Sequence, residues 1–408
     1  MTSGFDSGFD AGFGVVAAGA ESVHAVGGVG TLAVAFGPPR VYVHSGDGRR
    51  IAELVDAAVK RSYRTMQVSR AICVIPETDP QLALCDPREG RLLVIESSAF
   101  PLIWAGPISS LEGGPVAGTV QIEARSYEAV LQERYLPTEC AIDGTSGFVF
   151  EALHAAVEAE NPTGVSLSRD IAAGQPFDQT VYSDRSLFDA WTLVAQQTGQ
   201  EWWLEHEMGD DVLQTQAHFR PARGQDRTTD VQLMVGPWAN VRVNRWRISV
   251  EGAQHRIRGV AGATSATEAY GDRVRVERRL GKAPVSTAQL VQAQNMRHGY
   301  DFGKWPTGDT VLTRGERLAI LENVRGAGAL AIAAEATLLK GRTAQRAVDI
   351  ALQAAPELWQ FCTPGDVVRL NLPAPYFIDG IDTPVAILDV EVSEEDGTLR
   401  MTCEVPAA

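Results

Sequence analysis

Alternating apolar and polar positions dominate two stretches of this chain, one in each half. In the first, Val120–Arg125 places an apolar residue at every second position, which predicts a strand with one buried face. Another strand is predicted at 90–96, and Asp-Pro and Gly-Pro turn signals separate the strands. An apolar stripe at helical spacing over Arg50–Lys60 predicts one early helix. Residues 38–137 are therefore expected to form a β domain.

Between residues 138 and 240 the apolar spacing changes to that of helices. The first helix must end before Asn161-Pro162, because proline disfavours helical backbone in the residue before it. A second helix is predicted to start at the capping residue Ser186 and to end at Gly199. A strand then begins at Trp202, so the range 138–240 is expected to be a small α/β domain.

The remaining sequence is expected to form a connecting region and a second β domain. Alternation at 273–277 predicts a strand, and the Ala- and Leu-rich stretch 313–341 predicts a helix. Together they make 241–342 a β/α connecting domain. Alternation returns near the C-terminus, as at 398–405, and predicts the second β domain over 343–408.

Residues 1–37 differ from the rest because they are rich in glycine and repeat a Gly-Phe unit. Glycine loses much backbone entropy on ordering and adds no side chain to a core. The segment is interpreted as a flexible arm, with the alternative that Phe5, Phe9 and Phe13 anchor it on a neighbouring subunit. The run Gly27–Gly30 lacks the lysine and the strand–loop–helix context of a phosphate loop.

The two β domains share an order of turn signals that predicts an internal repeat. Each contains a Cys-x-Pro turn, Cys85-Asp86-Pro87 in the first and Cys362-Thr363-Pro364 in the second. A glycine then opens an apolar strand, and a later Gly-Thr pair opens another, at Gly118 and at Gly397. Convergent turn chemistry is the alternative, but one fold used twice is favoured. Strands curled into barrels would also remove exposed sheet edges.

Composition narrows the class of protein. The 408 residues are enough for about two to four domains. A net charge of −15 makes the chain a poor candidate for wrapping nucleic acid, because affinity for phosphate comes from Lys and Arg. Five widely spaced cysteines without a CxxC argue against a disulfide framework or a zinc site. No uncharged apolar run of about 18 residues occurs, so no membrane span is expected.

The best candidate for metal or acid–base chemistry is a group of acidic residues and histidines after Trp203. It comprises Glu205, His206, Glu207, Asp210, Asp211 and His218, in or beside a predicted hairpin. Such groups are common on solvated turns, so a plain surface hairpin is the preferred interpretation. Zinc-protease, nucleophile-elbow and phosphate-loop motifs are missing from the sequence. No catalytic, cofactor-binding or metal-binding residue is assigned, no cofactor is implied, and the protein is expected not to be an enzyme.

Tryptophan and arginine supply the other candidates for binding. Trp191 lies on a helical stripe and is expected in a core. For Trp202, Trp203, Trp238 and Trp359, a core or subunit interface is favoured over a platform for sugars. Trp246 is flanked by arginines that resemble a nucleic-acid strip, but a solvated or intersubunit salt-bridge face is favoured in an acidic chain. These arginines are Arg242, Arg245 and Arg247.

Four features carry a resemblance to a known family. They are the β region ending in Val120–Arg125, the following segment 126–131, the helix Ser186–Gly199 with Glu201-Trp202-Trp203, and the turn and strand 363–368. In this order they resemble the hub family of phage tails, which includes the baseplate hub of contractile-tailed phages and the tail-tip hub of siphophages. The resemblance implies a mixed β fold with an α/β insertion: two related β-barrel-like, tail-tube-like domains plus smaller α/β domains.

The resemblance also implies a structural role in a virion tail. In the family, three chains form a homotrimeric ring of pseudo-sixfold symmetry that joins the distal tail or tube ring to a central spike or fibre. The tape-measure protein is a further candidate partner, and DNA only passes through the channel during ejection. An acidic channel wall is a hypothesis that rests only on the net charge of −15. A module in 138–240 that binds host-surface glycan is the alternative, and a tail-associated cell-wall hydrolase is the third. Because the sequence ends at Ala408, after its last predicted strand, the enzymatic extension of some siphophage hubs is not expected.

Overall fold

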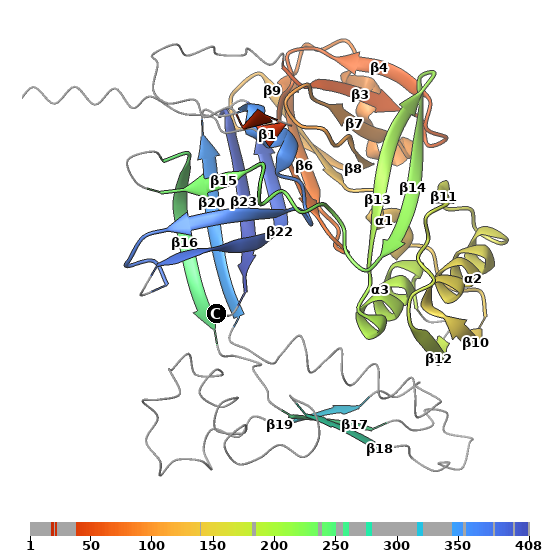
Figure 1. Cartoon of the computed structure of the whole chain (residues 1–408). Coiled ribbons are helices and arrows are strands. Elements are labelled where there is room, and N and C mark those ends of the chain that lie inside the picture. Colours follow the sequence, from red (N-terminus) through yellow and green to blue (C-terminus); the bar gives the residue numbers. More distant parts are fainter. Residues whose placement is uncertain are drawn as a thin grey trace, which may run out of the picture.

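A computed structural model describes two β lobes side by side and an α/β region beside the first lobe (Figure 1). The described residues are 38–138, 140–181, 185–235, 239–249, 345–353, 356–377, 380–394 and 396–406, with the short strands β1 (Ala18–Gly19), β2 (Glu21–Ser22), β17 (Arg256–Val260), β18 (Arg275–Arg279) and β19 (Glu316–Ile320). Most of the predicted arm, the run Gly27–Gly30 and Trp238 lie outside them. The predicted helix over 313–341 is wrong where it is described, because β19 pairs in parallel with β17 and this pairing overrides helix propensity.

The first lobe is an antiparallel sheet in the order β5-β6-β9-β8-β7-β3-β4. Its strands are β3 (Arg40–His44), β4 (Arg50–Leu54), β5 (Ala58–Arg64), β6 (Arg70–Pro76), β7 (Leu92–Glu96), β8 (Trp104–Gly113) and β9 (Thr119–Arg125), with short helical turns η1 (Leu82–Cys85) and η2 (Pro87–Glu89). On β6, Ala71, Cys73 and Ile75 are buried while their neighbours are not. The strands predicted at 90–96 and Val120–Arg125 are confirmed.

The helix predicted over Arg50–Lys60 is wrong. This segment forms β4, a turn in which Asp56 has φ of 54°, and the start of β5. Leu54 and Val59 point into the core, whereas Ile51 is 39% exposed. A stripe at helical spacing would have buried all three, so pairing with β3 and β6 decided the structure instead.

The second lobe repeats this architecture. It contains β15 (Gln232–Met234), β16 (Val241–Ser249), β20 (Gln345–Gln353), β21 (Val367–Leu372), β22 (Ile381–Ser393), β23 (Thr398–Val405) and the helical turn η4 (Pro356–Phe361). The strand order is β16-β20-β23-β22, with β21 beside β22 and β15 beside β21. The lobe thus draws β15 and β16 from the ranges assigned to the two middle domains.

The internal repeat is confirmed at the level of single residue pairs. The order β6-β9-β8-β7 in the first lobe matches β20-β23-β22-β21 in the second. Equivalent pairs are Leu92–Pro107 and Val367–Ala386, Pro76–Thr119 and Gln353–Thr398, and the equivalent bulges lie at Ile108/Ser110 and Ile387/Asp389. A bulge at the same register position is a specific structural feature, so convergent turns do not explain the similarity.

The lobes are joined edge to edge. The second half of β22 pairs with β5, so one continuous sheet crosses both lobes, and their inner faces share one apolar core. No pairing among the described strands closes either lobe into a barrel. The expected mixed β fold with an α/β insertion is confirmed, but the lobes are open sheets that join each other rather than separate barrels.

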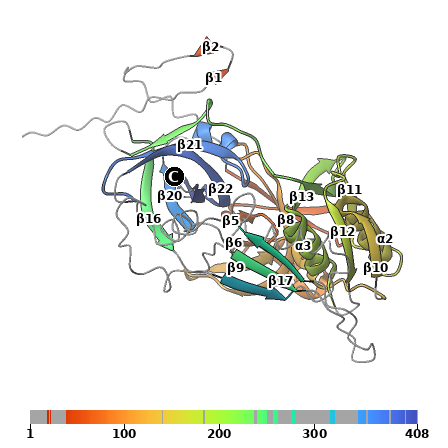
Figure 2. The ribbon, with the colours of Figure 1, turned by 60° about the horizontal axis from the view of Figure 1, so that its bottom comes forward.

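The α/β region packs around a second apolar core, in which Trp191 is buried together with Tyr42, Leu92, Val94 and Ala105 of the first lobe. The region contains α1 (Glu128–Gln132), β10 (Cys140–Thr145), α2 (Ser146–Glu158), β11 (Val165–Leu167), β12 (Pro176–Val181), α3 (Leu187–Thr198), β13 (Glu201–Gly209) and β14 (Val212–Arg220). Its helices α2 and α3 lie beside the strands β10 and β12 (Figure 2). Ser186 caps α3 by accepting a hydrogen bond from the Asp189 N–H, and Gly199 ends it with φ of 67°, as predicted. Among the described helices, none is long and apolar enough to span a bilayer.

Candidate functional site

The acidic and histidine group after Trp203 is divided among three places along the β13–β14 hairpin. Glu205 and His218 face each other across the strands, with His218 Nε2 3.0 Å from the Glu205 carboxylate. His206 lies near Tyr127 and hydrogen bonds to Thr215. Glu207 is exposed farther along β13, and Asp210 and Asp211 form the turn, both with positive φ. Within the described residues, no three metal-ligating side chains come together in a way that could hold a metal.

The tip of this hairpin is docked on the first lobe, beside β4 (Figure 1). The Arg50 N–H donates to the Asp211 carbonyl at 2.8 Å, and the Leu213 N–H donates to the Gly48 carbonyl at 2.8 Å. An ion pair of 2.5 Å between Arg50 and Asp211 closes the contact. The predicted hairpin is thus confirmed, and its acidic tip holds the α/β region against the first lobe.

A cavity of about 330 Å³ lies where the hairpin meets both lobes. The first lobe and α1 contribute Tyr63, Trp104 and Glu128, the hairpin contributes Trp203 and Glu205, the connector after β14 contributes Arg223, and the second lobe contributes Thr363. The Arg223 guanidinium lies 5.7 Å from the Trp203 ring centre. The cavity is therefore a polar junction of three parts of the molecule.

Burial or a hydrogen bond shifts the pKa of several ionisable groups around this cavity. Burial lowers the pKa of Arg223, against the opposing effect of carboxylates from all three parts: Glu128, Glu205, Glu201 and Asp366. Burial raises the pKa of Glu128, and it lowers the pKa of His206 to about 4. The hydrogen bond from His218 lowers the pKa of Glu205.

Glu128 and Glu205 are two carboxylates with opposite pKa shifts, which is a pattern that glycoside hydrolysis uses. Glu128 is only 9% exposed, however, and is therefore poorly placed to meet a polymeric substrate. Glu205 is already paired with His218. The arrangement fits an electrostatic junction centred on Arg223 better than an acid–base site.

The connector after β14 docks on the turn that precedes β21. Asp366 accepts hydrogen bonds from the Gln225 N–H at 2.8 Å and from the Thr363 N–H at 2.9 Å. Gly224 and Gly365 allow the two backbones to touch, because a Cβ on Gly365 would lie 2.3 Å from the Arg223 carbonyl oxygen. The turn and strand at 363–368, which helped to carry the family resemblance, therefore fasten the α/β region to the second lobe.

A buried ion pair holds the two lobes together. The Arg61 guanidinium on β5 contacts both carboxylate oxygens of Glu394, at 2.8 and 2.7 Å, at the end of β22. Arg61 also donates from Nε to the Tyr63 hydroxyl, which in turn donates to the Leu102 carbonyl. The Arg61 side chain is fully buried, so this bidentate pair has little competition from water.

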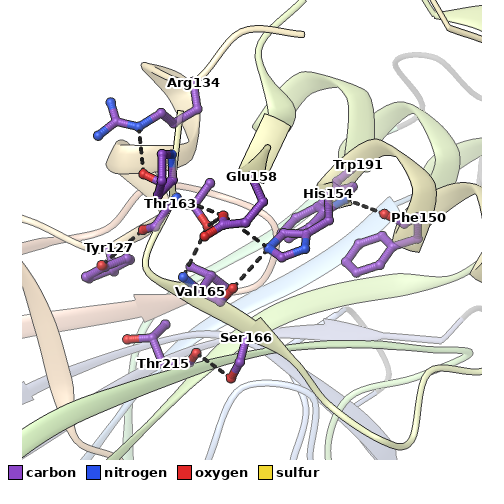
Figure 3. Close-up of polar contacts among 11 residues, drawn as sticks. Tyr127, Arg134, Phe150, His154, Glu158, Thr163, Val165, Ser166, Trp191 and Thr215 are labelled. Atoms are coloured by element: carbon purple, nitrogen blue, oxygen red, sulfur yellow. Dashed lines mark hydrogen bonds and ion pairs between the residues drawn. The ribbon is translucent and has the colours of Figure 1, made fainter. Parts of the chain in front are cut away.

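A second polar network anchors the loop between α2 and β11 (Figure 3). Glu158 accepts hydrogen bonds from the Thr163 N–H at 2.8 Å and from its hydroxyl at 2.7 Å. His154 Nε2 donates to the Val165 carbonyl at 2.9 Å. Tyr127, next to α1, donates from its hydroxyl to the Thr163 carbonyl at 3.2 Å. The loop is thereby tied to the segment that leaves the first lobe.

Most of the tryptophans that the structure describes are core residues. Trp191 and Trp202 are fully buried and pack edge to face, and Trp359 is buried on η4. Trp203 stacks on His218 at the cavity wall. Trp246 is different, because it is 40% exposed on β16 beside the exposed Arg242, Arg245 and Arg247. In the α/β region the described tryptophans Trp191, Trp202 and Trp203 are not exposed, and its exposed aromatic residues are Tyr135 and Phe148 instead.

No protein-family model and no curated protein matches the sequence. The fold, in contrast, is similar to solved structures along nearly the whole chain. A tail protein from Neisseria meningitidis MC58 is 15% identical, covering 90% of this chain and 96% of its own, with a TM-score of 0.53. The 43 kDa tail protein of prophage MuSo2 from Shewanella oneidensis is 14% identical, with coverages of 91% and 99% and a TM-score of 0.54. Prophage tail protein gp18 from Listeria monocytogenes EGD-e is 11% identical, with coverages of 90% and 95% and a TM-score of 0.53. At such identities the likeness establishes a shared fold, and the expected resemblance in fold to phage tail proteins is confirmed.

Proposed function

We propose that this chain is the structural hub of a phage or phage-like tail tip, in which three copies form a ring of pseudo-sixfold symmetry. The observation that supports this most is the repeat of two lobes with one strand order and one register. Three such chains would present six similar lobes around an axis, which suits a contact between a threefold tip and a sixfold tube.

In this proposal the ring joins the distal tail or tube ring to a central spike or fibre, with the tape-measure protein as a further partner, and DNA passes through its centre. A structural role is favoured over hydrolysis because two acidic residues of the hairpin are used in contacts. Glu205 pairs with His218, and Asp211 pairs with Arg50.

The outward face of the continuous sheet is a candidate lining of the channel, which is predicted to be acidic. Its charges are paired across strands: Lys60 and Arg400 lie 3.1 and 3.2 Å from the same Glu391 carboxylate. A channel lined by this part of the sheet would therefore present cations as well as carboxylates. Repulsion of DNA would then have to come from other acidic residues of the chain.

The test is the mass of the purified protein in solution by light scattering, with negative-stain images of the same sample. We expect a closed trimer with six peripheral lobes. A monomer or a dimer at every concentration would contradict the ring. Binding of the 138–240 region to a glycan array would instead favour the glycan-binding alternative.

A further inference from the structure

Several described strands have a free side, and two of these free edges, on β8 and β16, occupy matching positions in the repeat. β8 pairs with β7 over 104–107 and, on its opposite side, with β9 over 108–113. The side of 110–113 that faces away from β9 therefore has no partner among the strands that the structure describes. β16 ends the continuous sheet and pairs with β20 on one side.

The repeat shows which strand pairs with the equivalent of 110–113 in the other lobe. From the bulges and the pairings, 389–392 of β22 are equivalent to 110–113 of β8. In β22 this segment is not free, because β5 pairs with its second side. β16 is the equivalent of β5. In the first lobe, Lys60 of β5 lies opposite Ile72 of β6, and in the second lobe, Arg245 of β16 lies opposite Asp349 at the matching position of β20. The two unpaired segments are thus the counterparts of the two strands that form the joint between the lobes.

We propose that β8 of one copy pairs with β16 of the next copy, as β22 pairs with β5 within the chain. This step rests on the proposed ring and supplies its subunit interface. The joint places Glu391 opposite Ser62 and Val392 opposite Arg61. The equivalent register places Glu112 opposite Arg247 and Gly113 opposite Trp246. Such head-to-tail contacts are heterologous and can close into a ring.

The charges at the two free edges are complementary in the way that the joint requires. In the joint, Glu391 is approached by Lys60 at 3.1 Å and by Arg400 at 3.2 Å. At the free edge, Gln121 takes the place of Arg400 and already donates to Glu112 at 2.9 Å. Arg245, the counterpart of Lys60, would complete the cluster from the next copy.

The apolar side chains at the edges are complementary as well. In the joint, Arg61 and Glu394 are a buried ion pair. Their counterparts are Trp246 and Pro115, and next to Pro115 stands Val116. Trp246 is 40% and Val116 65% exposed, compared with 1% for Arg61. Exposed aromatic and aliphatic groups at both matching edges are typical of an uncovered subunit interface, here with a second copy of this chain.

The first test compares self-association of variants by sedimentation velocity. Trp246→Ala is expected to weaken association about 30-fold, as for a central interface tryptophan. Phe148→Ala is the matched control, because Phe148 is an aromatic residue that is 56% exposed on α2, away from both edges. Glu112→Arg and Arg245→Glu should each weaken association about threefold, and the double variant should restore it. Equal effects of Trp246→Ala and Phe148→Ala would overturn the proposal.

The second test fixes the register by cross-linking between copies. Two proteins, Glu112→Cys and Arg247→Cys, both in a Cys140→Ser background, are mixed and treated with a short bis-maleimide. A mixed dimer is expected, whereas Arg242→Cys, earlier on β16 and outside the mapped pairing, should give none with Glu112→Cys. A threefold ring without this cross-link would overturn the strand pairing and leave the hub proposal intact. The cross-link in an assembly without threefold symmetry would support the pairing and contradict the ring. A protein that stays monomeric and does not cross-link would overturn the pairing.

Discussion

The two lobes share strand order, register and even the position of a bulge, but their equivalent turns make different contacts. In the first lobe, Asp86 accepts a hydrogen bond from the Arg88 N–H and pairs with its guanidinium, so the turn after Cys85 is self-contained and exposed. In the second lobe, the turn after Cys362 contains Asp366, which is buried and accepts from Gln225 of the connector. One turn closes on itself, and the other fastens the α/β region.

The equivalent strands β5 and β16 also differ in what their side chains contact. Where the lobes meet, an ion pair between Arg61 and Glu394 is buried, and at the equivalent outer edge Trp246 is partly exposed. Backbone pairing and the alternation of apolar residues dictate the framework that both lobes share. The side chains at turns and edges then decide what each lobe contacts. Substitutions at equivalent positions should therefore have unequal effects wherever the contacts differ.

The largest effect is expected at the joint. Arg61→Ala leaves Glu394 buried without its partner, which should lower the free energy of unfolding by about 3–5 kcal/mol in urea denaturation. Arg400→Ala removes an exposed partner of Glu391 on the same sheet and should cost less than about 1 kcal/mol. The double variant Arg61→Met with Glu394→Met should recover much of the loss, since no unpaired charge remains. Equal losses for Arg61→Ala and Arg400→Ala would contradict a buried ionic joint.

The next effect separates the two turns. Gly365 has φ of 94°, and its Cβ would strike the Arg223 carbonyl, whereas Gly90 has φ of 63° and no atom within 4 Å of a Cβ. Gly365→Ala should cost about 3 kcal/mol or more, from backbone strain and overpacking together. Gly90→Ala should cost about 1 kcal/mol, from the backbone alone. If urea denaturation gives the same loss for both, the close docking of the connector is not present in solution.

A third prediction concerns a position where the lobes are alike. Cys85 and Cys362 are both fully buried, so Cys85→Ser and Cys362→Ser should each lower the free energy of unfolding by about 1–2 kcal/mol, because a hydroxyl is then buried.

The reactivity of the same thiols is a separate measurement. Burial raises the pKa of the Cys85 thiol to about 11, and it also raises the pKa of the Cys362 thiol. In a titration of the native protein with Ellman's reagent, only the half-buried Cys140 should react quickly. Fast reaction of Cys362 alone would show that the second lobe opens locally and the first does not.

Local signals made the repeat predictable from the sequence. Cys-x-Pro turns and Gly-Thr strand starts lie within a few residues of the structure they specify. The caps of α3 were predictable for the same reason. In contrast, Arg61 and Glu394 are 333 residues apart, and an isolated arginine or glutamate carries no sign of its partner.

The error at Arg50–Lys60 has a related cause. Its apolar residues fit a helix, and only the neighbouring strands select β4 and β5. The joint between the lobes and the docking of Asp366 on the connector likewise depend on tertiary contacts. The hairpin after Trp203 was predictable from its local pattern, but the docking of its acidic tip on β4 depends on the position of Gly48 and Arg50 in space.

The smallest predicted effect depends on pH and again compares equivalent positions, Asp389 in the second lobe and Ser110 in the first. Burial raises the pKa of Asp389, Arg64 opposes the shift, and Asp349 adds to it. A carboxyl whose pKa is raised in the folded state contributes stability below its unfolded pKa, and this contribution is lost as the pH rises through the folded pKa. At pH 7 the ionised Asp389 is therefore unfavourable, so Asp389→Ser should stabilise the protein slightly, by less than about 1 kcal/mol. The gain should disappear at about pH 3, near or below the ordinary aspartate pKa.

Asp382, on the same strand, is the matched control for this measurement. Its hydrogen bond with Arg369 lowers its pKa, so Asp382→Ser should destabilise the protein at pH 7, and the loss should shrink as the pH falls. Thermal unfolding of both variants from pH 7 to pH 3 gives the two slopes. Opposite signs are expected because Asp389 is half-buried near a second acidic residue, whereas Asp382 is exposed and hydrogen bonded to an arginine. If both variants changed stability in the same direction, side-chain volume rather than charge would govern Asp389, and the difference from Ser110 would carry no electrostatic meaning.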